Sequence, residues 1–264
     1  MTKQIAHPLT SSKWTFKQTL MTRITYAIID MNSRTGVTES LSVKKGEDDR
    51  FQIIEPSAST FYQGALAYDH LKPTSIGSTW FPEARKQDIS SKTVVLYLHG
   101  GGLRILLNTL HIPAGQIVLA GDSAELKLPP PKCCVLISPW TAPYDLNIKS
   151  SPNFNSDWLP PLFLKWGAST YGSSMRAPET HRYITPLGNP FKTSTPTFVN
   201  YGSAEIFDAN ITQWAQEMKN EGNAVEIHRE VNAPHDTFLL GEFLGFEESA
   251  RDVAVKVGSF IAKH

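Results

Sequence analysis

Three short, nearly unbroken runs of apolar residues constrain the fold of this chain more than any other feature of its sequence. They cover residues 93–98, 116–120 and 133–137. A strand that is apolar at almost every position is buried on both faces, as in a parallel sheet covered by helices. The runs therefore predict a parallel sheet rather than an antiparallel sheet with one face in water.

Strands and helices are predicted to alternate along the chain. Four more segments have the β-branched or aromatic composition of strands, at residues 51–56, 76–81, 197–201 and 224–228. Helices are predicted from the spacing of apolar residues at 211–218 and about 246–262, with a short helix near 159–171 and two short helices within 12–45. This alternation indicates an α/β fold, with a mostly parallel sheet and helices on both faces.

We expect a single α/β domain over residues 51–264, preceded by an N-terminal helical or cap segment at residues 1–50. Within the domain, residues 141–195 are rich in Pro, Ser, Asn and aromatic side chains. We expect this segment to be a small cap, an excursion over the carboxyl ends of the strands, where ligands bind in open α/β folds.

Composition excludes several classes of function. The 25 basic and 25 acidic side chains give a formal net charge of +0, unlike the basic balance of nucleic-acid binders. Cys133 and Cys134 are adjacent and are the only cysteines, so neither a disulfide framework nor a cysteine-based metal site is expected. No stretch reaches the roughly 20 apolar residues of a membrane span, and residues 1–29 lack the apolar core of a signal peptide. We therefore expect a cytoplasmic protein.

A glycine-rich sequence, His99-Gly100-Gly101-Gly102, directly follows the apolar run 93–98. Glycine lets backbone N–H groups approach a ligand closely. Two such groups aimed at a developing oxyanion are what acyl transfer requires. At the end of a buried strand, this sequence predicts an oxyanion hole.

A candidate nucleophile follows the run 116–120, in the sequence Gly121-Asp122-Ser123-Ala124-Glu125. Its first four positions match the G-x-S-x-G nucleophile elbow, in which the serine lies on a tight strand-to-helix turn. The fifth position carries Glu125 instead of glycine. The glycine-rich sequence upstream makes Ser123 more than an ordinary turn serine.

A candidate general base, His235, follows the last predicted strand. A histidine at that place can reach a serine on a neighbouring strand and take its proton. The acid that orients the base is expected on the loop after residues 197–201, where Glu205 and Asp208 both qualify. The order serine, acid, histidine is that of α/β-hydrolases.

Together these motifs resemble the hormone-sensitive-lipase group of carboxylesterases, α/β-hydrolases, and most of all its fungal members. The matching segments are HGGG at 99–102, GDSA at 121–124, LISPW at 136–140, TPL at 185–187, GSAE at 202–205, His235, and GSTWFP at 77–82. The resemblance covers roughly residues 50–264. It implies no metal or organic cofactor.

The resemblance also implies residue roles. Ser123 would be the nucleophile and His235 the base, with Gly100, Gly101 and Ala124 as oxyanion donors. Glu205 opens the turn that matches the family's D-P-L-type turn, so the resemblance favours it over Asp208. Asp208 would instead cap the helix that follows.

The chain is shorter than this family in two places. Only 13 residues, 103–115, lie where the family has a further helix, strand and helix. After the elbow the family has a long helix, whereas here three prolines at 129–131 stop any helix. We hypothesise that the central strand and the post-elbow helix are missing, as in a splice variant, a gene-model artefact or a decayed paralogue.

Two functions follow from these observations. The first is hydrolysis of a small-molecule carboxylic ester, with an apolar pocket lined by aromatic side chains of the cap region. Those side chains are Trp140, Tyr144, Phe154, Trp158 and Trp166. The alternative is a catalytically impaired or inactive hydrolase remnant.

Overall fold

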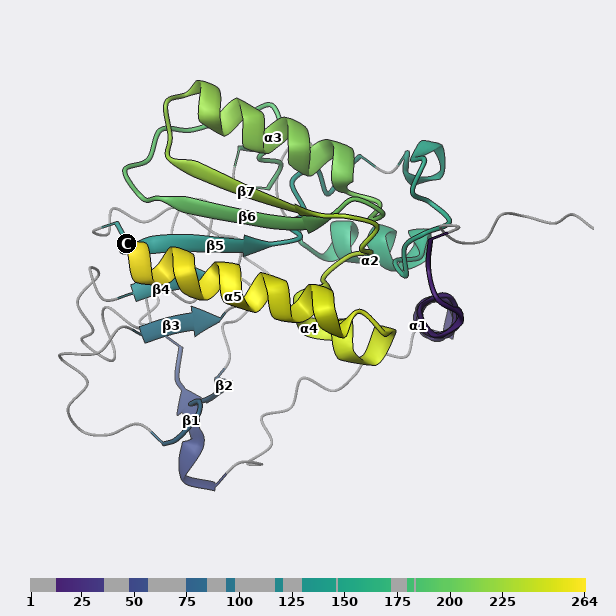
Figure 1. Cartoon of the computed structure of the whole chain (residues 1–264), viewed down its shortest axis with the longest axis horizontal. Coiled ribbons are helices and arrows are strands. Elements are labelled where there is room, and N and C mark those ends of the chain that lie inside the picture. The colour runs from purple at the N-terminus through teal and green to yellow at the C-terminus, as the bar shows by residue number, and fades with distance from the viewer. Residues whose placement is uncertain are drawn as a thin grey trace, which may run out of the picture.

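The computed structural model describes residues 13–35, 48–56, 75–84, 94–97, 117–120, 130–145, 147–171, 180–182 and 184–264 (Figure 1). The strands are β1 Phe51–Ile54, β2 Ile76–Thr79, β3 Val94–Tyr97, β4 Ile117–Ala120, β5 Cys133–Ile137, β6 Thr197–Gly202 and β7 Val225–Glu230. The helices are α1 Phe16–Thr35, α2 Pro161–Tyr171, α3 Asp208–Asn220, α4 Thr237–Leu244 and α5 Glu247–Lys263. Each predicted strand segment contains an observed strand.

The main sheet has the strand order β3-β4-β5-β6-β7, and every neighbouring pair is parallel. Strands β1 and β2 form a separate antiparallel pair. The prediction of a mostly parallel sheet is therefore confirmed. Because all five strands point the same way, the loops after β5, β6 and β7 leave the sheet at one edge, as Figure 1 shows.

Side chains of β5 and β6 alternate between two cores, and all six residues of β6 are buried. Val199 and Tyr201 pack with Ile211 and Trp214 of α3, whereas Phe198 packs with Phe260 of α5. Burying an apolar side chain of this size stabilises the fold by about 1.5–3 kcal/mol. The two faces of the sheet are thus covered by different helices, as predicted (Figure 1).

Two short helices were predicted within residues 12–45, whereas the described residues 13–35 contain one helix of 20 residues, α1. Residues 36–45 lie outside the described residues. No glycine or proline interrupts Phe16–Thr35. Its polar residues blur the amphipathic pattern but fit inside the helix: the Thr25 hydroxyl donates to the carbonyl of Met21 at 2.8 Å. Such a bond to the preceding turn satisfies a buried hydroxyl without breaking the helix.

Helix α4 was not predicted, although it begins two residues after His235. Asp236 is its N-cap, with a φ of 49°, and its side chain accepts the N–H of Leu239 at 3.1 Å. Gly245 ends the helix in the left-handed region, at a φ of 86°. The cap fixes the backbone that directly follows the candidate base.

The two places where the chain is shorter than the resembled family fall outside the described residues, apart from 130–131. The hypothesis of missing internal blocks therefore stays a prediction, as do the boundary at residue 50 and the cap at 141–195. In the part of the chain that the structure describes, no helix is long and apolar enough to cross a membrane.

Candidate active site

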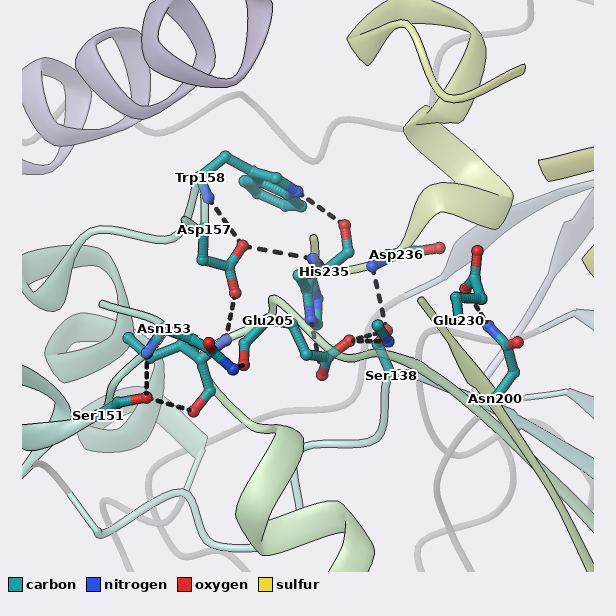
Figure 2. Close-up of polar contacts among 12 residues, drawn as sticks. Ser138, Ser151, Asn153, Asp157, Trp158, Asn200, Glu205, Glu230, His235 and Asp236 are labelled. Carbon is teal, nitrogen blue, oxygen red and sulfur yellow. Dashed lines mark hydrogen bonds and ion pairs between the residues drawn. The ribbon is translucent and has the colours of Figure 1, made fainter. Parts of the chain in front are cut away.

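The turn that follows β6 holds the carboxylate of Glu205 in a fully buried position. Its Oε2 accepts hydrogen bonds from the Ser138 hydroxyl at 2.7 Å and from the N–H of Gly202 at 2.9 Å. Its Oε1 faces the Nδ1 atom of His235 at 3.7 Å (Figure 2). One carboxylate oxygen is thus fixed by the protein, and the other is directed at the imidazole.

The loop that carries His235 is bound to the Glu205 turn through the backbone. The N–H of Ser203 donates to the carbonyl of Glu230 at 2.8 Å, and the N–H of Ala204 donates to that of Ala233 at 2.9 Å. These bonds continue the pairing of β6 with β7 beyond the sheet, and they bring the side chains of Glu205 and His235 to one place.

Gly202 is required for this approach. A Cβ atom at this position would lie 2.2 Å from the carbonyl oxygen of Ala233 and 2.5 Å from that of Pro234. Such contacts are far inside van der Waals distance, so a larger residue would push the His235 loop away. The glycine of the GSAE segment is therefore explained by the close approach of two backbones.

The charges around His235 favour its protonated form. Burial lowers the pKa of the imidazole, but the carboxylates of Glu205, Asp157 and Asp236 outweigh burial and raise this pKa to about 9. At 3.7 Å, Nδ1 and Oε1 are beyond hydrogen-bond range and form an ion pair. Within the described part of the chain, neither atom has a hydrogen-bond partner.

Two aromatic rings flank the imidazole of His235. The ring of Trp158 lies 5.3 Å away at an angle of 64°, and that of Phe207 lies 5.5 Å away at 83°. Both are edge-to-face arrangements. The Nε1 atom of Trp158 also donates to the carbonyl of His235 at 2.8 Å. The base is therefore held at its ring and its backbone.

Residues 151–156 of the predicted cap segment hold the Glu205 turn from the other side. Side chains of this stretch donate to all four successive carbonyls of residues 203–206. The bonds are Asn153 Nδ2 to Ser203 at 3.0 Å and to Glu205 at 2.9 Å, Ser156 Oγ to Ala204 at 2.8 Å, and Ser151 Oγ to Ile206 at 3.4 Å. A turn with every carbonyl satisfied can stay buried at low cost.

Ser138 links the two loops at the end of β5. Its hydroxyl donates to Glu205 and accepts the N–H of Asp236 at 3.0 Å. Its φ is 45°, which costs a non-glycine residue about 1–2 kcal/mol. The N–H of Ser138 donates to the carbonyl of Asn200 at 2.7 Å, which helps to hold this disfavoured conformation.

Of the residues predicted for the site, the structure brings Glu205 and His235 together. Asp208, the alternative acid, instead binds Arg229 through both carboxylate oxygens, at 2.6 and 2.8 Å. The expectation that Asp208 caps α3 is wrong, because Phe207 holds the cap position and Asp208 is the first residue of the helix. The remaining predicted residues, Ser123, Gly100, Gly101 and Ala124, lie outside the described residues.

The five aromatic residues predicted to line a pocket lie in different surroundings. Trp158 contacts His235, and Trp140 stacks on Phe207 at 5.7 Å. Phe154 packs against the main core, the Tyr144 hydroxyl donates to the carbonyl of Ala168 at 2.7 Å, and Trp166 is 49% exposed. Of these five, Trp158 contacts His235 directly, and Trp140 packs on Phe207, which in turn contacts His235.

Several contributors to the site carried no assigned role in the sequence, among them Asp157, Asn153 and Ser138. Asp157 is fully buried and accepts backbone N–H groups of Trp158, Ile206 and His235. The one available signal was the density of Ser, Asn and Asp between residues 150 and 157. Within the described residues, no group of three or more His, Cys, Asp or Glu is placed to hold a metal ion.

Several solved esterases share this fold. EstE5, from a crystal soaked with p-nitrophenyl butyrate, has a TM-score of 0.63 at 16% identity and covers 95% of this chain and 99% of that one. An esterase/lipase from an uncultured bacterium has a TM-score of 0.61 at 15% identity, and the match covers 95% of this chain and 99% of that one. A hormone-sensitive lipase from a metagenome library has a TM-score of 0.51 at 23% sequence identity. The match covers 61% of this chain and 58% of that one. No curated protein matches the chain in sequence.

A family model described as alpha/beta hydrolase fold matches residues 104–239. That range covers just over half of the 264 residues. It contains Ser123, Glu205 and His235. With the esterase-like fold and the parallel sheet described above, the chain belongs to the alpha/beta hydrolase fold family.

Proposed function

We propose that this protein hydrolyses small-molecule carboxylic esters, with Ser123 as nucleophile, His235 as general base and Glu205 as the acid that orients the base. The observation that supports this most is the buried Glu205 Oε1 atom, which lies 3.7 Å from His235 Nδ1. A buried carboxylate against one imidazole nitrogen is the arrangement that serine hydrolases need. The family match, which spans all three positions, adds to it.

In the proposed reaction, the Ser123 hydroxyl attacks the ester carbonyl and His235 Nε2 takes its proton. The imidazolium is stabilised by Glu205 at Nδ1 and returns the proton to the leaving alcohol. Water then attacks the acyl-enzyme by the same route and releases the acid. Backbone N–H groups of Gly100, Gly101 and Ala124 would bind the oxyanion.

We further propose that the chain is a fungal-type member of the hormone-sensitive-lipase group that lacks two internal blocks. The 13-residue stretch 103–115 and the prolines at 129–131 support this. Reading the genomic DNA between the codons for Gly102 and Gln116, and after Ala124, tests it. The absence of coding-like sequence at both places would contradict the proposal.

Hydrolysis of p-nitrophenyl butyrate by the full chain and by Ser123→Ala tests the proposed activity. Loss of the nucleophile should lower kcat by at least about a thousandfold. Ser259→Ala is a matched control, because this exposed serine of α5 only donates to the carbonyl of Val255. Its rate should equal that of the unchanged chain.

Equal rates for the unchanged chain and Ser123→Ala would overturn the esterase proposal. If neither exceeds the spontaneous rate while a thermal melt shows one cooperative transition, the chain is an inactive hydrolase remnant. The melt thus separates a folded protein without activity from one that does not fold.

A further inference from the structure

Asp157 is a buried carboxylate for which the proposed reaction has no use. It is fully buried in the segment that follows β5. Its Oδ1 accepts the N–H of Trp158 at 2.7 Å and that of His235 at 3.4 Å, and its Oδ2 accepts the N–H of Ile206 at 2.6 Å. These three donors are all backbone groups, and two of them belong to the loops that carry Glu205 and His235 (Figure 2).

A carboxylate is costly to bury, so its place here calls for a reason. A carboxylate has two acceptor oxygens, whereas asparagine offers one oxygen and an NH₂ group. Asp157 uses one oxygen to accept from Ile206 and the other to accept from His235. Asp157 therefore links the Glu205 turn to the His235 loop and sets the spacing between them.

Asp157 also acts on His235 through its charge. The negative charges of Glu205, Asp157 and Asp236 all raise the pKa of the imidazole. Burial raises the pKa of Asp157 to about 6, with opposing contributions from His235, which lowers it, and Glu205, which raises it. At neutral pH Asp157 is therefore mostly an anion close to an imidazolium.

We propose that Asp157 is a positioning residue, whose carboxylate joins the Glu205 turn to the His235 loop and supplies a second negative charge to the imidazolium. This inference rests on the proposed function for its catalytic consequence. Trp158, the next residue, completes the arrangement because its indole donates to the His235 carbonyl. Both backbone groups of His235 are thus held by two adjacent residues.

The test is Asp157→Asn in the full chain, with the protonation of His235 followed by NMR of labelled histidine and assigned with His235→Gln. Removing the negative charge of Asp157 should lower the titration midpoint of His235 by about one pH unit. The acidic limb of the pH–rate profile for p-nitrophenyl butyrate should move by the same amount. On the alkaline plateau, where His235 is neutral in both proteins, we expect kcat to fall about tenfold with KM unchanged.

Asp145→Asn is the matched control. Asp145 is an exposed carboxylate in the same segment, and it binds Asn147 and Asn210. Its removal should leave the His235 midpoint and the pH profile unchanged. A purely structural role for Asp157 predicts a lower melting temperature with an unchanged midpoint, and that result would overturn the inference.

A reciprocal measurement keeps the inference testable if Asp157→Asn does not fold. In His235→Gln the carboxyl ¹³C resonance of Asp157 should titrate at a higher pH than in the unchanged chain, because the imidazolium is gone. An unchanged Asp157 midpoint would count against the inference. Neither titration needs esterase activity, so a failed Ser123→Ala test would remove the proposed function and leave this inference open to its own result.

Discussion

Two glutamates of this protein are buried within the same half of the sheet, and they differ in what faces them. Glu205, after β6, is 0% exposed, and Glu230, at the end of β7, is 4% exposed. Glu230 accepts from the Asn200 amide at 2.8 Å through Oε1, and from the hydroxyls of Thr237 and Ser249 through Oε2. Glu205 has the same kind of support on Oε2 alone, while its Oε1 faces His235.

This difference is what we expect between a structural carboxylate and one that acts in the proposed reaction. Every oxygen of Glu230 is satisfied by a neutral donor, so its charge is dispersed over hydrogen bonds. Among the residues that the structure describes, none forms a hydrogen bond with Oε1 of Glu205 or with Nδ1 of His235. An unsatisfied buried pair is costly, and such sites tend to be kept where they serve a reaction. Burial alone would not have told the two glutamates apart.

Replacing Glu205 and Glu230 by glutamine in turn should give the largest difference in kcat. In Glu205→Gln the amide oxygen would accept from Ser138 and Gly202, so the NH₂ would face His235 Nδ1. The imidazole would then carry its proton on Nε2 and could not take the serine proton. We expect kcat for p-nitrophenyl butyrate to fall about 10³–10⁴-fold.

Glu230→Gln is the matched control for that loss. Its hydroxyl partners can rotate to accept from the new NH₂, so the hydrogen bonds survive without the charge. We expect kcat within about threefold of the unchanged chain and a free energy of unfolding lower by about 1–2 kcal/mol. Equal activity losses in both variants would contradict the distinction between them.

The pH dependence of hydrolysis sharpens the comparison. His235 must be neutral to accept a proton, and its pKa is raised to about 9. Below that pH the base is protonated, so kcat/KM should rise about tenfold per pH unit from pH 7 until it levels near pH 9. Rates corrected for spontaneous ester hydrolysis measure this limb. A limb near pH 6.5 would mean that the carboxylates do not act on the imidazole.

The same ion pair affects stability with a defined sign. The folded-state pKa of about 9 lies above the unfolded value of about 6.5, so the native state holds the proton more tightly. Its stabilisation is complete below pH 6.5 and is lost as pH rises to about 9. Glu230→Gln keeps the Glu205–His235 ion pair, so its thermal melts should show this loss of stability as pH rises from about 6.5 to about 9. If His235→Gln shows no such loss, the ion pair is its source.

The sequence was informative where a signal is local. Apolar runs such as 133–137 predicted strands buried on both faces, and the position of His235 after a strand predicted a base that lies beside a Glu205 or Asp208 carboxylate. Both signals depend on residues adjacent in the chain. The resemblance favoured Glu205 over Asp208, and the coordinates add the direction of each side chain: Glu205 faces His235 and Asp208 binds Arg229.

The supporting residues could not be predicted, because their partners are backbone atoms far away in the sequence. Asp157 binds the N–H of Ile206 across 49 residues and that of His235 across 78. Every non-proline residue has such an N–H, so the partner leaves no mark on the sequence. Helix α4 was missed for a related reason: its start depends on the left-handed conformation of Asp236.

The smallest expected effect comes from the third carboxylate, Asp208, three residues beyond Glu205. It binds Arg229, whose side chain is 49% exposed, and such pairs contribute about 0–1 kcal/mol. Asp208→Asn should leave kcat and KM within twofold and lower the melting temperature slightly, as should Arg229→Gln. If Asp208→Asn instead abolished hydrolysis while Glu205→Gln did not, Asp208 would be the acid. Glu205 would then be a structural carboxylate like Glu230, and its open oxygen would need another explanation.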